Sequence, residues 1–165
     1  MYKSFSHGWT TAADSVLSAG RTFSRVLLAA EVYEYSGRVR EAISLLDTIL
    51  EETDNANRSA VWERYGACCL KAGDTNRALQ SLKKAISVTQ NMDDRGRLLD
   101  LLSRTHINRG AYQQAIKCAT DALTDGLDCG LLADLHDDIG VSSSYLGKVS
   151  QARDHLNQAF TLHHQ

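Results

Sequence analysis

Apolar residues recur along this chain at the spacing of a helix that buries one face. Around residue 62 they fall at positions i, i+3 and i+7, as Trp62, Tyr65 and Cys69. A second stripe follows after a glycine, where Ala78 and Leu82 stand four residues apart. Residues spaced in this way share one side of an α-helix, so each stripe predicts an amphipathic helix. Two stripes separated by a glycine predict a pair of helices packed against each other.

This pattern occurs four times. Each occurrence is marked by a glycine followed five residues later by an alanine, at Gly37/Ala42, Gly73/Ala78, Gly110/Ala115 and Gly147/Ala152. The intervals between the glycines are 36, 37 and 37 residues. Self-similarity at such a period is typical of supersecondary units that stack on their neighbours, so the sequence predicts a repeat scaffold.

Aligning the four units on their glycines gives columns of constant residue type. Seven residues before the glycine the side chain is small, and thirteen after it the side chain is large and apolar. The small residues are Ala30, Gly66, Ser103 and Gly140, and the large ones are Leu50, Ile86, Leu123 and Phe160. Small residues allow helices to cross closely, and a glycine can take the left-handed conformation that ends a helix. Each unit is therefore predicted to be an antiparallel helix pair.

The composition favours the same fold class. The 165 residues include eleven glycines and no proline, which suits long helices ended by glycine turns better than short strands. We expect an all-α domain over residues 1–165. Its helix pairs are predicted at 23–52, 57–90, 93–125 and 129–163, and a half-repeat helix at 9–20 is predicted to cap the first pair.

The columns of the second unit resemble the tetratricopeptide repeat (TPR). The unit reads Trp62-x2-Tyr65-Gly66-x2-Cys69, then Gly73, and then Ala78-x3-Leu82-x2-Ala85, which is similar to W-x2-L-G-x2-Y followed by A-x3-F. The units are two or three residues longer than the family's usual length of about 34, and the closing proline is absent. The resemblance implies a right-handed α-solenoid of about four helix pairs, and a function in protein–protein interaction.

Charge and motifs exclude several other functions. Eighteen basic and twenty acidic residues give a formal net charge of −2, which does not favour nucleic acid or an anionic membrane. The sequence lacks G-x-G-x-x-G, G-x-S-x-G and H-E-x-x-H strings, so we predict no enzyme activity and no cofactor. No apolar run reaches the roughly 20 residues of a membrane span, and a cytoplasmic location is expected.

The candidate metal ligands are better interpreted as packing residues. Cys68, Cys69, Cys118 and Cys129 show no C-x-x-C spacing, and we expect them to be free thiols that fill apolar space. His136 precedes two aspartates, but it occupies the column of Val26 and Trp62, and a partly buried packing role is predicted for it. We therefore predict no metal site.

The TPR resemblance implies that the first helix of each pair lines a concave face where a ligand would lie. Positions transferred to that face are Leu27, Glu31, Glu34 and Tyr35; Glu63, Arg64, Ala67 and Lys71; Arg97, Asp100, Leu101, Arg104 and Asn108; and Asp134, Asp137, Asp138, Val141 and Tyr145. From these, the predicted site for a protein or peptide partner comprises Glu31, Tyr35, Arg64, Lys71, Arg97, Arg104, Asn108, Asp134, Asp137 and Tyr145. Leu27 and Glu31 replace the lysine and asparagine of members that clamp a chaperone carboxylate, which argues against that ligand.

The longest stretch without a basic residue lies between Lys117 and Lys148. It contains Asp121, Asp125, Asp128, Asp134, Asp137 and Asp138. These residues either form a solvated face or receive a basic segment of a partner, and the sequence leaves both interpretations open.

The carboxyl end suggests an alternative function. The fourth unit runs to Gln165 without a further helix to cover Leu156, Phe160 and Leu162. Uncovered apolar positions at the end of a repeat array predict an interface. The chain could self-associate there, dock a partner there, or continue a longer repeat array.

Overall fold

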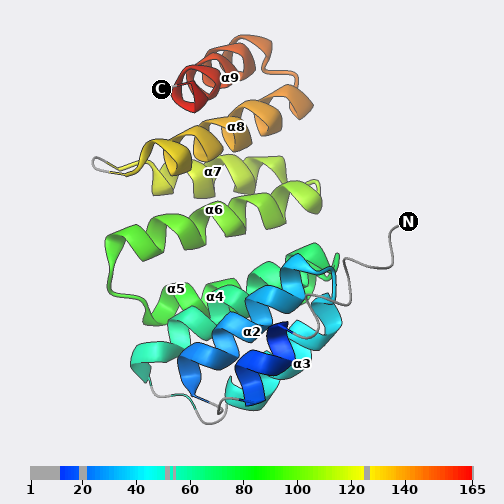
Figure 1. Cartoon of the computed structure of the whole chain (residues 1–165). Coiled ribbons are helices and arrows are strands. Elements are labelled where there is room, and N and C mark those ends of the chain that lie inside the picture. Colours follow the sequence, from blue (N-terminus) through cyan, green and yellow to red (C-terminus); the bar gives the residue numbers. More distant parts are fainter. Residues whose placement is uncertain (1–11, 19–21, 51–52, 54, 125–126, 165) are drawn as a thin grey trace. The chain divides into compact units, whose positions relative to one another are not determined.

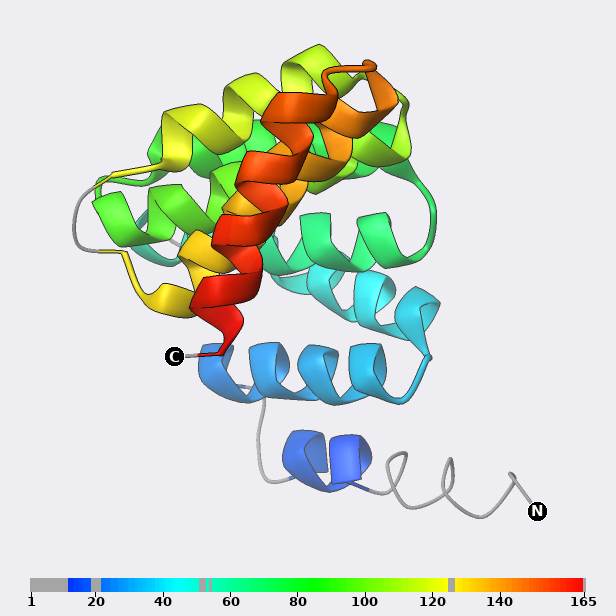
Figure 2. The same cartoon turned by 90° about the horizontal axis from the view of Figure 1, so that it is seen from above.

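The computed structural model describes residues 12–18, 22–50, 53, 55–124 and 127–164. Within these ranges the chain forms helices joined by turns, without a strand, as Figures 1 and 2 show. The predicted all-α fold class is confirmed. Two compact units divide the chain, Met1–Val88 and Thr89–Gln165, and each is described by itself.

The first unit contains two antiparallel helix pairs. Its helices are α2 (Phe23–Tyr35), α3 (Val39–Leu50), α4 (Asn55–Lys71) and α5 (Thr75–Val88), preceded by a helix over residues 12–18. Consecutive helices pack on each other, and α2 also contacts α4. The first helices of the two pairs are therefore neighbours (Figure 1).

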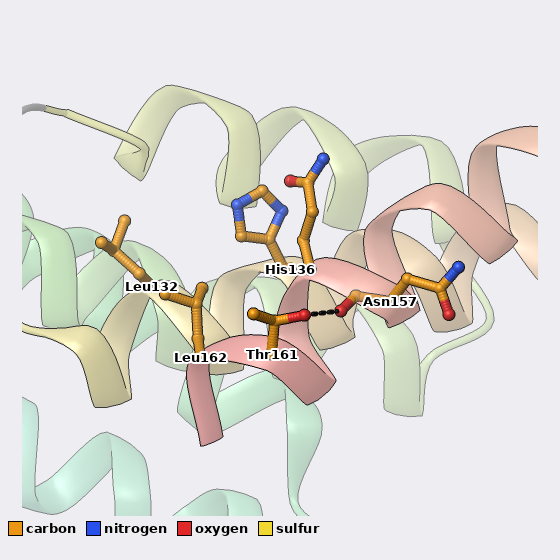
Figure 3. Close-up of a pocket in the computed structure, with 6 residues that line it drawn as sticks. Leu132, His136, Asn157, Thr161 and Leu162 are labelled. Carbon is orange, nitrogen blue, oxygen red and sulfur yellow. Dashed lines mark hydrogen bonds between the residues drawn. The ribbon is translucent and has the colours of Figure 1, made fainter. Parts of the chain in front are cut away.

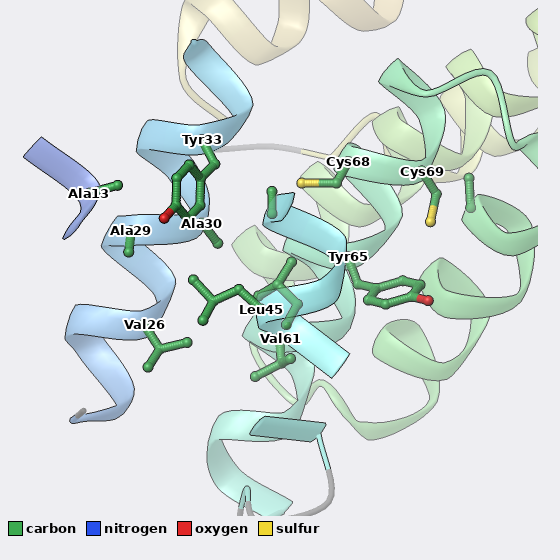
Figure 4. Close-up of a cluster of buried hydrophobic side chains, with 13 residues drawn as sticks. Ala13, Val26, Ala29, Ala30, Tyr33, Leu45, Val61, Tyr65, Cys68 and Cys69 are labelled. Carbon is green, nitrogen blue, oxygen red and sulfur yellow. The ribbon is translucent and has the colours of Figure 1, made fainter. Parts of the chain in front are cut away.

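Small side chains allow these helices to approach closely. Ala29, Ala30 and Ala42 are fully buried in the core of this unit, together with Leu46 and Val61 (Figure 4). At Gly66 a Cβ atom would lie 2.7 Å from Cγ of Leu82 on α5, so the helix crossing requires a residue without a side chain.

The helix over residues 12–18 packs on α2. Ala13 is fully buried in the same core, and Figure 4 shows it beside Tyr33 and Ala29. The Tyr33 hydroxyl donates a hydrogen bond of 3.0 Å to Oδ1 of Asp14. The remaining residues of the predicted half-repeat, 9–11 and 19–20, lie outside the described residues.

The second unit repeats this arrangement. Its helices are α6 (Met92–Asn108), α7 (Tyr112–Ala122), α8 (Cys129–Tyr145) and α9 (Val149–His163). Consecutive helices are in contact, and the first helices α6 and α8 also touch each other. Side-chain caps start both first helices: the Asn91 side chain accepts from the Asp93 N–H at 2.8 Å, and Asp128 accepts from the Leu131 N–H at 2.9 Å.

The glycine turns are formed as the sequence predicts. Gly37, Gly73, Gly110 and Gly147 have φ values of 78°, 78°, 71° and 73°, in the left-handed region. After Gly37, the N–H of Arg38 donates to the Tyr33 carbonyl at 2.8 Å, which caps the end of α2. Because the same turn closes all four first helices, the column alignment relates structurally equivalent positions.

Candidate interaction sites

In the first unit, four of the predicted site residues surround one buried carboxylate. Glu31 and Tyr35 lie on α2, Arg64 and Lys71 lie on α4, and Glu34 stands between them with a side chain only 6% exposed. We call these five residues the α2/α4 charge cluster. The contact between α2 and α4 brings together residues that lie far apart in the sequence.

Both oxygens of Glu34 have a cationic partner. Nη1 of Arg64 donates to Oε2 at 3.1 Å, and Nζ of Lys71 lies 2.7 Å from Oε1. The Cys68 thiol adds a weaker contact at 3.7 Å, and Nη2 of Arg64 is 3.6 Å from Glu31. A buried charge is tolerated when it is paired and hydrogen-bonded in this way. The cluster is thus neutral, with two acids and two bases.

The pairing also affects the neighbouring groups. Burial alone would lower the pKa of Arg64, but its hydrogen bond to Glu34 and the charge of Glu31 outweigh that effect and raise it. Burial raises the pKa of the Cys68 thiol to about 12 and that of Cys69 to about 11, and the charge of Glu34 adds to the effect at Cys68. Both cysteines are fully buried free thiols, in agreement with the predicted packing role, whereas the same prediction is wrong for Cys129, which is exposed at the start of α8.

One aromatic side chain at this cluster is open to solvent. Tyr35 is 71% exposed, and Nζ of Lys71 lies 5.2 Å from the centroid of its ring. A ring held beside a cation presents a rigid, partly apolar surface at low entropic cost, which is typical of interface residues.

In the second unit, the corresponding face carries mainly acids. Asp100 and Arg104 lie on α6, Asp134 and Asp138 lie on α8, and we call these four residues the α6/α8 acidic cluster. Asp100 is 6% exposed and Asp138 is 9% exposed, whereas Asp134 and Arg104 are open to solvent. Nη1 of Arg104 is 4.0 Å from Oδ2 of Asp100. Three acids and one base leave this cluster negatively charged when all are ionised.

Burial makes ionisation of the two buried acids unfavourable. The pKa of Asp138 is raised to about 7: burial is the largest cause, the charges of Asp100 and Asp134 add to it, and a hydrogen bond with Ser103 and the charge of Arg104 oppose it. Burial also raises the pKa of Asp100 to about 6, where Arg104 opposes the shift and Asp134 adds to it. The charge of Asp134 thus acts on both buried acids and that of Asp100 acts on Asp138, in agreement with the contact between α6 and α8.

Several buried polar atoms on α6 and α8 lack a hydrogen-bond partner among the described residues. They are Oδ1 of Asp100, Oδ2 of Asp138, and the hydroxyl oxygens of Ser142 and Ser143. Ser142 follows Asp138 by four residues and so lies on the same side of α8. Unpaired buried polar atoms are costly and uncommon, so the two carboxylate oxygens and the Ser142 hydroxyl are informative.

The other predicted site residues on α6 lie apart from this cluster. Arg97 pairs with Asp94 one turn earlier on the same helix. Asn108 is exposed at the end of α6.

Two predicted residues of α8 contact the second helices of their unit. Asp137 lies 3.3 Å from Nε2 of His163 on α9. Tyr145 is 67% exposed and stacks on Tyr112 of α7, with ring centroids 4.5 Å apart and planes within 3° of parallel. Arg104 and Asp134 are thus the two members of the predicted set that the second unit brings together.

The binding site predicted from the sequence did not include the three buried carboxylates. Glu34, Asp100 and Asp138 were placed on the groove-facing side but not in the site. The alignment did contain a usable signal, because Arg64 and Asp138 occupy one column, nine residues before their turn glycines. Opposite charges at equivalent positions indicate that the two faces differ in their electrostatics.

Apolar side chains are exposed at the carboxyl end. Leu156 is 38% exposed, Phe160 is 65% exposed and Leu162 is half-buried. A pocket of about 450 Å³ lies between α8 and α9 (Figure 3). Its lining residues are Leu132, His136, Asn157, Gln158, Thr161 and Leu162.

His136 on this pocket forms a pair with His155. Their Nδ1 atoms are 2.8 Å apart, and both rings are partly buried. Burial lowers the pKa of His136, and the charge of His155 lowers it further. A packing role with one polar contact accounts for this histidine.

Two further observations bear on function. Among the residues that the structure describes, no three His, Cys, Asp or Glu side chains are grouped so that they could hold a metal ion. Over the same residues, none of the helices is long and apolar enough to cross a membrane.

Comparison with known proteins confirms the resemblance to the tetratricopeptide repeat. Residues 59–92, which cover most of α4 and α5, match the family model described as tetratricopeptide repeat. These residues belong to the second repeat, whose sequence matches the tetratricopeptide pattern better than the other three repeats do. A search of curated protein sequences finds no match.

Solved structures share the fold of the whole chain. MamA residues 41 to the end from Desulfovibrio magneticus RS-1 is 15% identical with a TM-score of 0.71, covering 99% of this chain and 98% of that chain. MamA from AMB-1 is 21% identical with a TM-score of 0.72, covering 96% and 91%. A putative kinesin light chain with TPR-like repeats from Podosopora anserina is 14% identical with a TM-score of 0.74, covering 95% and 84%. The fold is therefore that of a TPR-like helical solenoid, and the repeats support protein–protein interaction in general.

Proposed function

We propose that this protein is a non-catalytic scaffold or adaptor that binds a peptide or helical segment of a partner protein on the faces formed by its first helices. The observation that carries the proposal is the concentration of charged and exposed aromatic side chains there. Tyr35 of the α2/α4 charge cluster and Tyr145 on α8 are 71% and 67% exposed. Aromatic residues next to charged groups are typical of protein interfaces.

We also propose a cytoplasmic location. The support is chemical: Cys68 and Cys69 are neighbouring, fully buried free thiols, a state that is typical of a reducing compartment.

The test is affinity capture from cell extract followed by mass spectrometry, with wild type and the Tyr35→Ala/Tyr145→Ala double variant. Both side chains are mostly exposed, so the variant should keep its helicity and lose or weaken the captured partner. Val149→Ala is the matched control, because Val149 is 75% exposed on the second helix α9. Equal capture by wild type and the double variant would contradict binding on these faces.

A second candidate function is assembly through the carboxyl-terminal repeat, either between copies or with further repeats. It is favoured by the exposed Phe160 and Leu156 and by the adjoining pocket with Leu162 at its edge. Light scattering over a range of concentrations tests it: wild type should associate and Phe160→Glu should be monomeric. A wild type that stays monomeric at high concentration would exclude self-association.

A further inference from the structure

We infer that the α6/α8 acidic cluster is a binding site for a basic side chain, the lysine ammonium or arginine guanidinium of a partner segment. The inference rests on the proposed function, which supplies the class of partner, and goes beyond it by naming the chemistry that one face recognises.

The charge of the cluster favours a cationic ligand. Asp100, Asp134 and Asp138 bring three carboxyl groups to the α6/α8 face. Arg104 is the cation whose charge favours ionisation of Asp100 and Asp138. Arg104 is solvent-exposed and reaches Asp100 only at 4.0 Å. Asp138 forms no ion pair with any described residue at this distance or less. A second cation would therefore meet uncompensated negative charge.

The cluster also holds hydrogen-bond acceptors without donors. Oδ1 of Asp100 and Oδ2 of Asp138 are buried acceptors that have no partner among the described residues, and the hydroxyl oxygen of Ser142 lies unpaired on the same side of α8. An ammonium group carries three N–H donors, and a guanidinium carries five. A basic side chain thus offers the donors that these acceptors lack, and the resulting bonds would be charge-assisted.

The first unit shows how a buried carboxylate is compensated on such a face. There the chain itself supplies two cations, Arg64 and Lys71, to Glu34. In the second unit two acids are buried, and Arg104 is the cation whose charge acts on both. A partner would supply the second cation.

Metal ions and anions fit the cluster less well. Among the described residues no group of three potential ligands is placed to hold a metal ion. An anion would be repelled by the three carboxyl groups, and a metal ion would require ionised ligands at a closer spacing.

Binding should be coupled to proton release. The charged groups that act on Asp100 and Asp138 are Arg104 on α6 and Asp134 on α8, and neither α7 nor α9 contributes a described group to their shifts. Because a cation prefers the ionised carboxylates, the affinity for a lysine peptide should rise roughly tenfold or more between pH 5 and pH 8.

The test uses the full chain and three short, acetylated and amidated peptides. One peptide carries two lysines, and glutamine or glutamate replaces both lysines in the other two. NMR titration at low salt and pH 8 follows the side-chain carboxyl carbons of Asp100 and Asp138. We expect the lysine peptide to shift both signals with saturation and the other two peptides to leave them unchanged.

The variant Asp138→Asn should weaken binding of the lysine peptide at least tenfold, and Asp100→Asn gives an independent second test. Asp121→Asn is the matched control, because Asp121 is an exposed acid on α7 and its substitution removes the same charge from the protein. Unaltered binding by both cluster variants would overturn the inference, and so would the absence of binding at millimolar lysine peptide.

The outcome can be separated from that of the proposed function. If a captured partner is lost with Tyr35→Ala/Tyr145→Ala but kept with Asp138→Asn, the scaffold proposal stands and the cation site is wrong. If the partner is kept in every variant, the proposed function itself fails.

Discussion

The α2/α4 charge cluster and the α6/α8 acidic cluster both lie where the first helices of two pairs meet, yet their electrostatics differ. In each unit these first helices contact each other and carry buried carboxyl groups. Glu34 has a cation on each oxygen. Asp100 and Asp138 keep one unpaired oxygen each. The three buried acids stand three, ten and nine residues before their turn glycines, so the repeat places the helices, and the residues at individual positions decide whether charge is neutralised within the chain.

This difference has opposite consequences for stability. A paired buried carboxylate stabilises the folded state only while its partners are present. A buried acid without a sufficient partner is most favourable when it is protonated, so its ionisation works against folding. The first cluster should be sensitive to loss of a cation, and the second should be sensitive to pH.

The largest effect is expected from Arg64→Met, which removes one of the two cations from Glu34. The free energy of unfolding should fall by roughly 2–3 kcal/mol, because a buried carboxylate is left with Lys71 alone. Urea denaturation at pH 7 measures the change. Arg97→Met is the control, since its ion pair with Asp94 is solvent-exposed and should contribute less than about 0.5 kcal/mol.

Adding Glu34→Gln to Arg64→Met should recover part of the loss, because the uncompensated charge is then removed. A double variant that is as unstable as the sum of the two single variants would mean that Glu34 and Arg64 do not interact in the folded state.

Asp138→Asn should have a smaller effect of the opposite sign, and the effect should depend on pH. The pKa of Asp138 is raised from 3.8 to about 7 in the folded chain. Between these values the folded state binds more protons than the unfolded state, so this group lowers stability as the pH rises. The variant should therefore equal wild type near pH 4 and be more stable by roughly 1–3 kcal/mol at pH 8.

Thermal and urea denaturation of both proteins at several pH values measures this difference. A gap that does not widen between pH 5 and pH 8 would contradict the unpaired state of Asp138. Asp121→Asn serves again as the control, and its difference from wild type should be nearly constant over the same range.

The smallest effect is expected from Lys71→Met. Its side chain is 49% exposed, so water screens its ion pair with Glu34 and the loss should stay below about 1 kcal/mol. Loss of the cation should also release the Tyr35 ring from its contact at 5.2 Å. Urea denaturation measures the loss of stability, and NMR of the Tyr35 ring detects the loss of its contact with Lys71. If Lys71→Met lowers the free energy of unfolding as much as Arg64→Met does, solvent exposure does not determine how strongly each cation stabilises Glu34.

Much of the fold could be predicted from the sequence, because local rules determine it. The left-handed turns at Gly37, Gly73, Gly110 and Gly147 follow from the one residue that adopts positive φ without strain. The small column predicts close helix crossing, and Gly66 against Leu82 shows the steric reason. The resemblance to the tetratricopeptide repeat then implied the fold class.

The candidate sites were less predictable, because burial of a charge depends on side chains from several helices. The acidic run between Lys117 and Lys148 could be interpreted as one solvated face or one patch. In the structure its members separate: Asp128 caps α8, Asp137 meets His163 on α9, and Asp138 is buried toward α6. Asp125 lies outside the described residues. Only the three-dimensional packing distinguishes these roles.

The second unit holds two buried carboxyl groups, each with one oxygen that lacks a hydrogen-bond partner among the described residues, and we propose that a cation of a partner binds them. The most direct test is the pKa of Asp138, measured by NMR of its carboxyl carbon in the full chain with and without saturating lysine peptide. We predict a value of about 7 in the free protein and a clear decrease when the peptide is bound. A value near that of an ordinary aspartate in the free protein, or one that the lysine peptide does not lower, would contradict the account.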